Sequence, residues 1–196
     1  IATSGVVELS GAYGIQALPG AYTIAFQTTV APGAVQAVSL TVTVRNCVAG
    51  EYENAQSKLC TVCQDGRFSG DNEQQCTTCP PGLFSNTTGS SNCHHCPHGR
   101  YSPSNASQTC QECSAGTYNN VTTQSICYSC TPGYSVAVTG ASSCVACGPG
   151  SYSPLSSSIN CLVCPSGRAN NAFGASVCVT CTTGTFASVP GSFVCE

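Results

Sequence analysis

The sequence has no methionine and no tryptophan, and only 7% of its 196 residues are charged. Soluble domains usually carry about a quarter of their residues as Asp, Glu, Lys or Arg. The chain has only five scattered Lys and Arg and a net charge of −3, so we expect no nucleic-acid binding. No apolar run reaches the roughly 18 residues of a membrane-spanning helix, so we expect no span within these residues.

Charge is most sparse in the second half of the chain. Between Glu112 and Glu196 the only charged residue is Arg168. Solubility there must come from uncharged polar side chains, from glycans or from burial against neighbouring chains. Because the variable residues are mostly Ser, Thr, Asn and Gly, we expect no concentrated apolar or charged surface patch.

The residues needed for catalysis are also missing. A nucleophile needs a positioned base and an orienting acid. The only bases are His94, His95 and His98, and Asp65 and Asp71 lie in a different part of the repeat pattern described below. We therefore predict that the chain is not an enzyme.

The same histidines flank Cys96, which raises the question of a metal site. The alternative is that they are exposed residues of one disulfide loop, and we favour that interpretation. The few acidic residues form no recognisable oxygen cage for calcium. We predict no metal site and no cofactor.

Cysteine, in contrast, is abundant and periodic. From Cys47 to Cys195 the pattern C-x-x-C-x-x-G-x-[YF] recurs and settles at a period of 17 residues. Such a period indicates a repeat array, and each unit is too short to build its own core without covalent or metal links. The C-x-x-C pairs are Cys60/Cys63, Cys76/Cys79, Cys93/Cys96, Cys110/Cys113, Cys127/Cys130, Cys144/Cys147, Cys161/Cys164 and Cys178/Cys181.

Zinc and disulfides are the two alternatives for these links. Zinc sites built from the C-x-x-C pairs would leave Cys47 and Cys195 without partners, whereas pairing across the long gaps uses all 18 cysteines. The cysteine density is typical of disulfide scaffolds in oxidising compartments, so we favour disulfides. The predicted pairs are Cys47–Cys60, Cys63–Cys76, Cys79–Cys93, Cys96–Cys110, Cys113–Cys127, Cys130–Cys144, Cys147–Cys161, Cys164–Cys178 and Cys181–Cys195.

Three N-glycosylation sequons begin at Asn86, Asn105 and Asn120, all in the long gaps where we expect exposed loops. Sequons and disulfides together predict an extracellular or cell-surface location. Pro103 and Pro154 follow serines at equivalent places. We interpret them as turn prolines, with hydroxylation and O-glycosylation as the alternative.

Glycine and aromatic residues occupy fixed positions in the unit, and we interpret both as packing positions. A glycine three residues after a cysteine indicates a positive φ angle or a close backbone approach. We expect each unit to touch only its neighbours, which gives a rod on the order of 100 Å long. The glycines include Gly50, Gly66, Gly82, Gly99, Gly116, Gly133, Gly150, Gly167 and Gly184, and the aromatics Tyr52, Phe68, Phe84, Tyr101, Tyr118, Tyr152 and Phe186.

Residues 47–196 resemble the ephrin-receptor-like cysteine-rich repeat, a module similar in style to those of the tumour necrosis factor receptor and epidermal growth factor. The resemblance rests on the recurring C-x-x-G-x-[YF] and C-x-x-C. It implies small disulfide-rich repeats that are β-poor and loop-rich, with short hairpins and no helix longer than a turn. Such repeats serve as stalks, spacers and adhesive arrays in large cell-surface proteins.

The sequence of residues 1–46 predicts a different, all-β domain. Tyr22, Ile24 and Phe26 alternate with smaller or polar residues, and residues 38–45 alternate in the same way. With a shorter strand near residues 6–9, they look like the closing strands of an immunoglobulin-like sandwich. We therefore expect a fragment of a larger extracellular mosaic protein.

The function expected from these features is a structural spacer or stalk of a secreted or cell-surface glycoprotein, within a filament, cell-wall layer or flagellar hair. The alternative is a receptor or adhesin ectodomain that binds a protein ligand through the repeats. Expected partners are other extracellular proteins, copies of the same chain, and N-linked or O-linked glycans.

Overall fold

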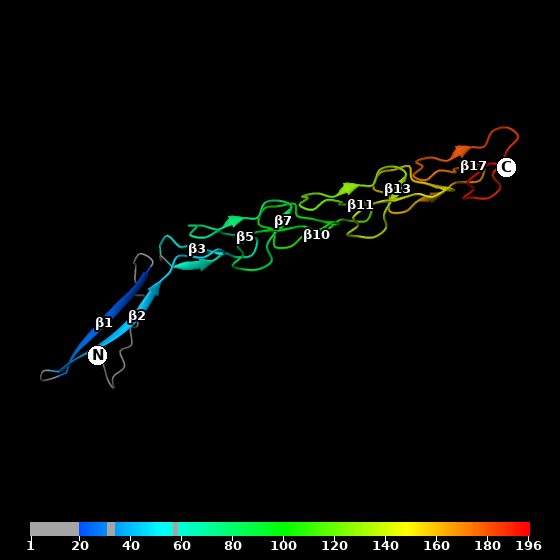
Figure 1. Cartoon of the computed structure of the whole chain (residues 1–196). Helices are drawn as coiled ribbons and strands as arrows, with labels where there is room; N and C mark the ends of the chain where they lie inside the picture. The colour runs from blue at the N-terminus through cyan, green and yellow to red at the C-terminus, as the bar shows by residue number, and fades with distance from the viewer. Residues whose placement is uncertain (1–19, 31–33, 57–58) are drawn as a thin grey trace.

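The computed structural model describes residues 20–30, 34–56 and 59–196, with side chains from Arg45 onward. These residues form an elongated rod, with a long hairpin at its N-terminal end (Figure 1). Strands and turns are the only regular structure in the described part of the chain. A helix able to cross a membrane is likewise missing from it. The predicted disulfide-rich fold, free of helices and built from short hairpins, is confirmed.

The N-terminal hairpin pairs β1 (Gly20–Val30) with β2 (Ala34–Val44). The pairing is antiparallel and runs from Gly20↔Val44 to Val30↔Ala34. Both strands expected from the alternating pattern are therefore present. The strand expected near residues 6–9 lies outside the described residues, so the immunoglobulin-like assignment of residues 1–46 stays a prediction.

The rest of the chain is a ladder of nine units, numbered from the N-terminus, each beginning at the first cysteine of a disulfide. The units span 47–62, 63–78, 79–95, 96–112, 113–129, 130–146, 147–163, 164–180 and 181–196. Each of the first eight contains one antiparallel hairpin. The hairpins are β3 (Glu51–Glu53) with β4 (Cys60–Val62), β5 (Arg67–Phe68) with β6 (Thr77–Thr78), β7 (Leu83–Phe84) with β8 (His94–His95), β9 (Arg100–Tyr101) with β10 (Gln111–Glu112), β11 (Thr117–Tyr118) with β12 (Tyr128–Ser129), β13 (Tyr134–Ser135) with β14 (Val145–Ala146), β15 (Ser151–Tyr152) with β16 (Leu162–Val163), and β17 (Arg168–Ala169) with β18 (Val179–Thr180).

A tight turn leads into the first strand of each hairpin, and its sequence explains its shape. In unit 3 the amide of Leu83 donates to the carbonyl of Pro80, which closes a four-residue turn. The third residue of that turn is Gly82, with a φ of 85°. Positive φ at this position and proline at the second position are the signature of a type II turn, and Pro81 supplies the proline.

The core of the ladder is narrow and consists of sulfur and small side chains, most of them polar. In each of units 2 to 8 the first cysteine is buried, and so is the residue six positions later, directly after the usual aromatic position. The aromatic residues are partly covered rather than fully buried, and Phe186 is exposed. The buried residues at that later position are Ser69, Ser85, Ser102, Asn119, Val136, Ser153 and Asn170, with Ala187 in unit 9.

Successive units are joined by four backbone hydrogen bonds, which the junction between units 5 and 6 illustrates. Gly116 donates to Val136 at 2.8 Å, and Cys130 donates back to Gly116 at 2.9 Å. Gly140 donates to Cys113 at 2.8 Å, and Asn119 donates to Ala141 at 3.1 Å. Because the same four bonds recur along the array, the units form a continuous stack rather than separate beads.

The expectation that each unit touches only its neighbours is wrong. A Cβ placed on Gly116 of unit 5 would lie less than 3.0 Å from the carbonyl oxygen of Ser157, which belongs to unit 7. Side chains reach equally far, since Glu112 of unit 4 accepts a hydrogen bond from Thr139 of unit 6 at 3.1 Å. Each internal unit is therefore braced by the second unit along as well as by the first, and this opposes bending.

Candidate functional site

The candidate functional features of the ladder are the disulfides along its axis and the exposed side chains on its surface. Along the axis each long gap is closed by a disulfide, with Cα–Cα distances between 5.4 and 5.8 Å. No free cysteine occurs in the described chain. The bonds join Cys47–Cys60, Cys63–Cys76, Cys79–Cys93, Cys96–Cys110, Cys113–Cys127, Cys130–Cys144, Cys147–Cys161, Cys164–Cys178 and Cys181–Cys195.

Two buried asparagines add side-chain links between units, and sequence reasoning missed both. The amide of Asn119 donates to the carbonyl of Arg100 in the preceding unit at 2.7 Å and accepts from the backbone of Val121 at 3.1 Å. Asn170 repeats this arrangement with Ser151 at 2.9 Å. The only signal in the sequence is the small polar residue that follows the aromatic in most units.

We expect Asn119→Ala to lower the stability of the ladder by about 1–3 kcal/mol, because it removes both hydrogen bonds from a fully buried site. Hydrogen exchange of the Val121 amide would report the local loss. Asn120→Gln is the matched control, since Asn120 is exposed and its replacement removes only the sequon. Equal protection of Val121 in wild type and Asn119→Ala would show that the link contributes nothing.

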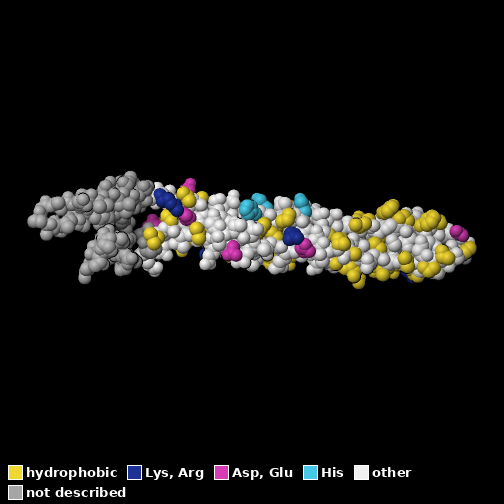
Figure 2. All heavy atoms as spheres, turned by 90° about the horizontal axis from the view of Figure 1, so that it is seen from below, with side chains coloured by type: hydrophobic (Ala, Val, Ile, Leu, Met, Phe, Trp, Pro, Cys, Tyr) yellow, Lys and Arg dark blue, Asp and Glu magenta, His cyan; other side chains and the backbone are white. Residues whose placement is uncertain are grey.

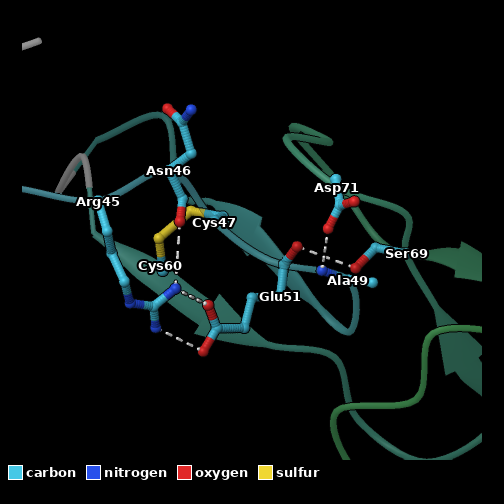
Figure 3. A network of polar contacts seen from close by, with 8 residues as sticks. All are labelled: Arg45, Asn46, Cys47, Ala49, Glu51, Cys60, Ser69 and Asp71. Atoms are coloured by element: carbon cyan, nitrogen blue, oxygen red, sulfur yellow. Dashed lines mark hydrogen bonds and ion pairs between the residues drawn. A yellow bond between two sulfur atoms is a disulfide. The ribbon is translucent and has the colours of Figure 1, made fainter. Parts of the chain in front are cut away.

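The joint between the hairpin and the ladder is held by an ion pair (Figure 3). Arg45, directly after β2, donates to both carboxylate oxygens of Glu51 in β3, at 2.7 and 2.9 Å. The hydrogen bond from Arg45 holds the pKa of Glu51 below its usual range, and the same bond raises the pKa of Arg45. The pair is therefore charged at neutral pH and links the residue that follows β2 to the first unit of the ladder.

The first junction of the ladder has two further side-chain contacts (Figure 3). The carboxylate of Asp71 accepts a hydrogen bond from the amide of Ala49 at 2.8 Å. The hydroxyl of Ser69 donates to the carbonyl of Glu51 at 2.9 Å. Unit 2 therefore holds unit 1 with side chains as well as backbone, next to the joint.

The histidines predicted to be exposed lie on the surface. The ring of His94 packs against Phe84 with centroids 5.9 Å apart, and Nδ1 of His95 contacts the hydroxyl of Thr123 at 2.7 Å. Within the part of the chain that the structure describes, no group of three or more His, Cys, Asp or Glu could hold a metal ion. The three sequon asparagines, Asn86, Asn105 and Asn120, are exposed.

The surface contradicts the expectation that no apolar concentration exists. We call residues 47–112 the polar half and residues 113–196 the apolar half. Of the large hydrophobic side chains exposed in the described residues, three lie in the polar half and seventeen in the apolar half. Figure 2 shows them gathered over the C-terminal part of the rod, with the histidines and most charged side chains on the other part.

The comparisons with known proteins agree with the repeat geometry. Residues 66–108 and 133–177 match the family model described as tyrosine-protein kinase ephrin type A/B receptor-like. No curated protein matches the chain. The matched family and the nine disulfides indicate an extracellular cysteine-rich region. The two matched segments of the ladder are ephrin-receptor-like cysteine-rich repeats, and the same spacing of disulfides continues through the rest of the ladder.

Proposed function

We propose that the chain is a stiff, glycosylated spacer in a secreted or cell-surface protein. The observation that supports this most directly is the bracing of each internal unit by the first and second units along the ladder. An array held only by single links between neighbours would bend at every link. A braced array keeps whatever lies at its two ends at a fixed separation, which is the task of a stalk.

The surface of units 3 to 5 supports the glycosylation in this proposal. Asn86, Asn105 and Asn120 are exposed in loops, where the modifying enzyme could reach them. Glycans there would cover the middle of the rod. The N-terminal domain, residues 1–46, would complete an immunoglobulin-like sandwich at one end of the spacer.

The experiment is small-angle X-ray scattering on the disulfide-bonded 196-residue chain, combined with mass spectrometry of non-reduced peptides. We expect a rod-like scattering profile, disulfides across the long gaps and sugar on the three asparagines. Scattering typical of a flexible chain would contradict the stiff spacer, and bare asparagines would contradict the glycan cover.

A receptor or adhesin region is the second candidate, and the apolar half favours it. A large exposed apolar surface on a soluble domain usually marks a contact with another molecule. A spacer needs no such surface, so the exposed apolar side chains of this half point to another molecule that covers them.

A further inference from the structure

We propose that units 6 to 9, residues 130–196, pair side by side with the same units of a second copy of this chain. The inference rests on the rod of the proposed function, because only a stiff rod presents an extended contact line. It adds a partner and a surface that a spacer alone does not require. Four observations carry it.

The first is a set of apolar side chains at one position of the repeat, which begins at the middle of the ladder. The first residue of the second hairpin strand is apolar or aromatic in units 5 to 8 and is 42% to 69% exposed. At the same register units 1 to 4 carry exposed polar residues. We call the apolar residues Tyr128, Val145, Leu162 and Val179 the strand set; their polar equivalents are Thr61, Thr77, His94 and Gln111.

The second observation is a parallel set of exposed apolar residues in the long gaps. Val121, Val138, Leu155 and Val189 lie eight residues after the first cysteine of units 5, 6, 7 and 9. The first set therefore recurs once per unit in units 5 to 8, and the second set does the same except in unit 8, where Ala172 stands. The surface that matches this spacing over several units is another ladder of the same repeat, which is why we assign the occupant as a second copy.

The third observation is that units 6 to 9 have few charged side chains and no predicted glycosylation site. Units 6 to 9 carry only Arg168 and the terminal Glu196 as charged side chains, so two copies of this face meet with little like-charge repulsion. The last sequon begins at Asn120, in unit 5. Glycans on the predicted sites would thus lie outside the paired region.

The fourth observation is area. A standard interface removes about 800 Å² from each partner, of which about 60% is apolar. Units 6 to 9 expose fourteen large apolar side chains. If half of them face the partner and each contributes roughly 70 Å², they supply on the order of 500 Å² of apolar area. This matches the apolar share of a stable interface.

The test compares the wild-type chain with the triple variant Val145→Thr/Leu162→Gln/Val179→Thr by sedimentation velocity over a range of concentrations. Threonine and glutamine occupy this register naturally at Thr77 and Gln111, so the fold should tolerate them. Glutamine replaces Leu162 because threonine there would create a sequon at Asn160. The matched control is Thr77→Ser/Gln111→Ser, at the same register in the polar half.

We expect the wild type and the control to dimerise, and the triple variant to need at least about tenfold more protein to do so. A wild type that stays monomeric at about 200 μM overturns the inference and would leave the surface to an unrelated protein. A dimer weakened equally by the control, or not weakened by the triple variant, also overturns it. Scattering from the monomeric fraction separates the two proposals, because a monomer that is still rod-like leaves the spacer intact.

Discussion

The variant Gly116→Ala should disrupt the middle of the ladder, whereas Gly167→Ala should be tolerated much better. Both glycines have positive φ, 82° and 79°, so alanine costs about 1–2 kcal/mol of backbone strain at either site. Both also donate a backbone hydrogen bond of 2.8 Å to the next unit. They differ in what lies beside them.

At Gly116 the new methyl group would lie less than 3.0 Å from the carbonyl oxygen of Ser157 in the second unit along. Gly167 lies in unit 8, and the 196 residues include only one unit after it, so in this chain its methyl group would meet nothing within 4 Å. Accommodating the methyl group at Gly116 requires unit 7 to move away from unit 5, at a further cost of about 1–3 kcal/mol. Movement of unit 7 weakens the bond from Ser157 to Cys130, so hydrogen exchange at the Ser157 amide is the local readout. If both variants lost the same hydrogen-exchange protection at Ser157 and the same thermal stability, the contact between unit 5 and unit 7 would contribute nothing to the stability of the ladder.

Local chemistry made part of this fold predictable. A glycine three residues after a cysteine, with a proline before it, specifies a turn without reference to distant residues. Alternation in the segment that contains Tyr22 and Val42 likewise specifies the two strands of the N-terminal hairpin. In both cases the sequence neighbours decide the backbone conformation.

Contacts that depend on stacking were not predictable in the same way. Gly116 and Ser157 approach each other only because three units stack in register. Neither residue type indicates a contact with a residue 41 positions away in the sequence. The exposed residues Val145, Leu162 and Val179 look like isolated apolar residues when read along the chain. They belong together because the repeat places them at the same register of successive hairpins.

Removing the central disulfide with Cys113→Ala/Cys127→Ala should turn the rod into two rods joined by a flexible segment. The loop has a sequence separation of 14 residues, and opening it costs about 3 kcal/mol in the chain-entropy model. Unit 5 also contacts units 3 and 7, through Gly82 with Thr123 and Gly116 with Ser157. Loss of its shape therefore removes the bracing on both sides.

The terminal disulfide is the matched control, because Cys181–Cys195 closes a loop of the same separation, 14 residues. Cys181→Ala/Cys195→Ala should fray only unit 9 and leave the scattering profile rod-like. Chymotrypsin combined with mass assignment of the cut sites separates the two cases. A chain cut only after Tyr118 stays tied by Cys113–Cys127 in the wild type but gives two fragments in the central variant without reduction. A cut after Tyr128, which no disulfide spans, releases fragments from every variant and is not counted. If the central variant resists chymotrypsin as well as the terminal one does, the backbone hydrogen bonds alone hold the stack. The disulfides would then act on the unfolded chain rather than on the stiffness of the rod.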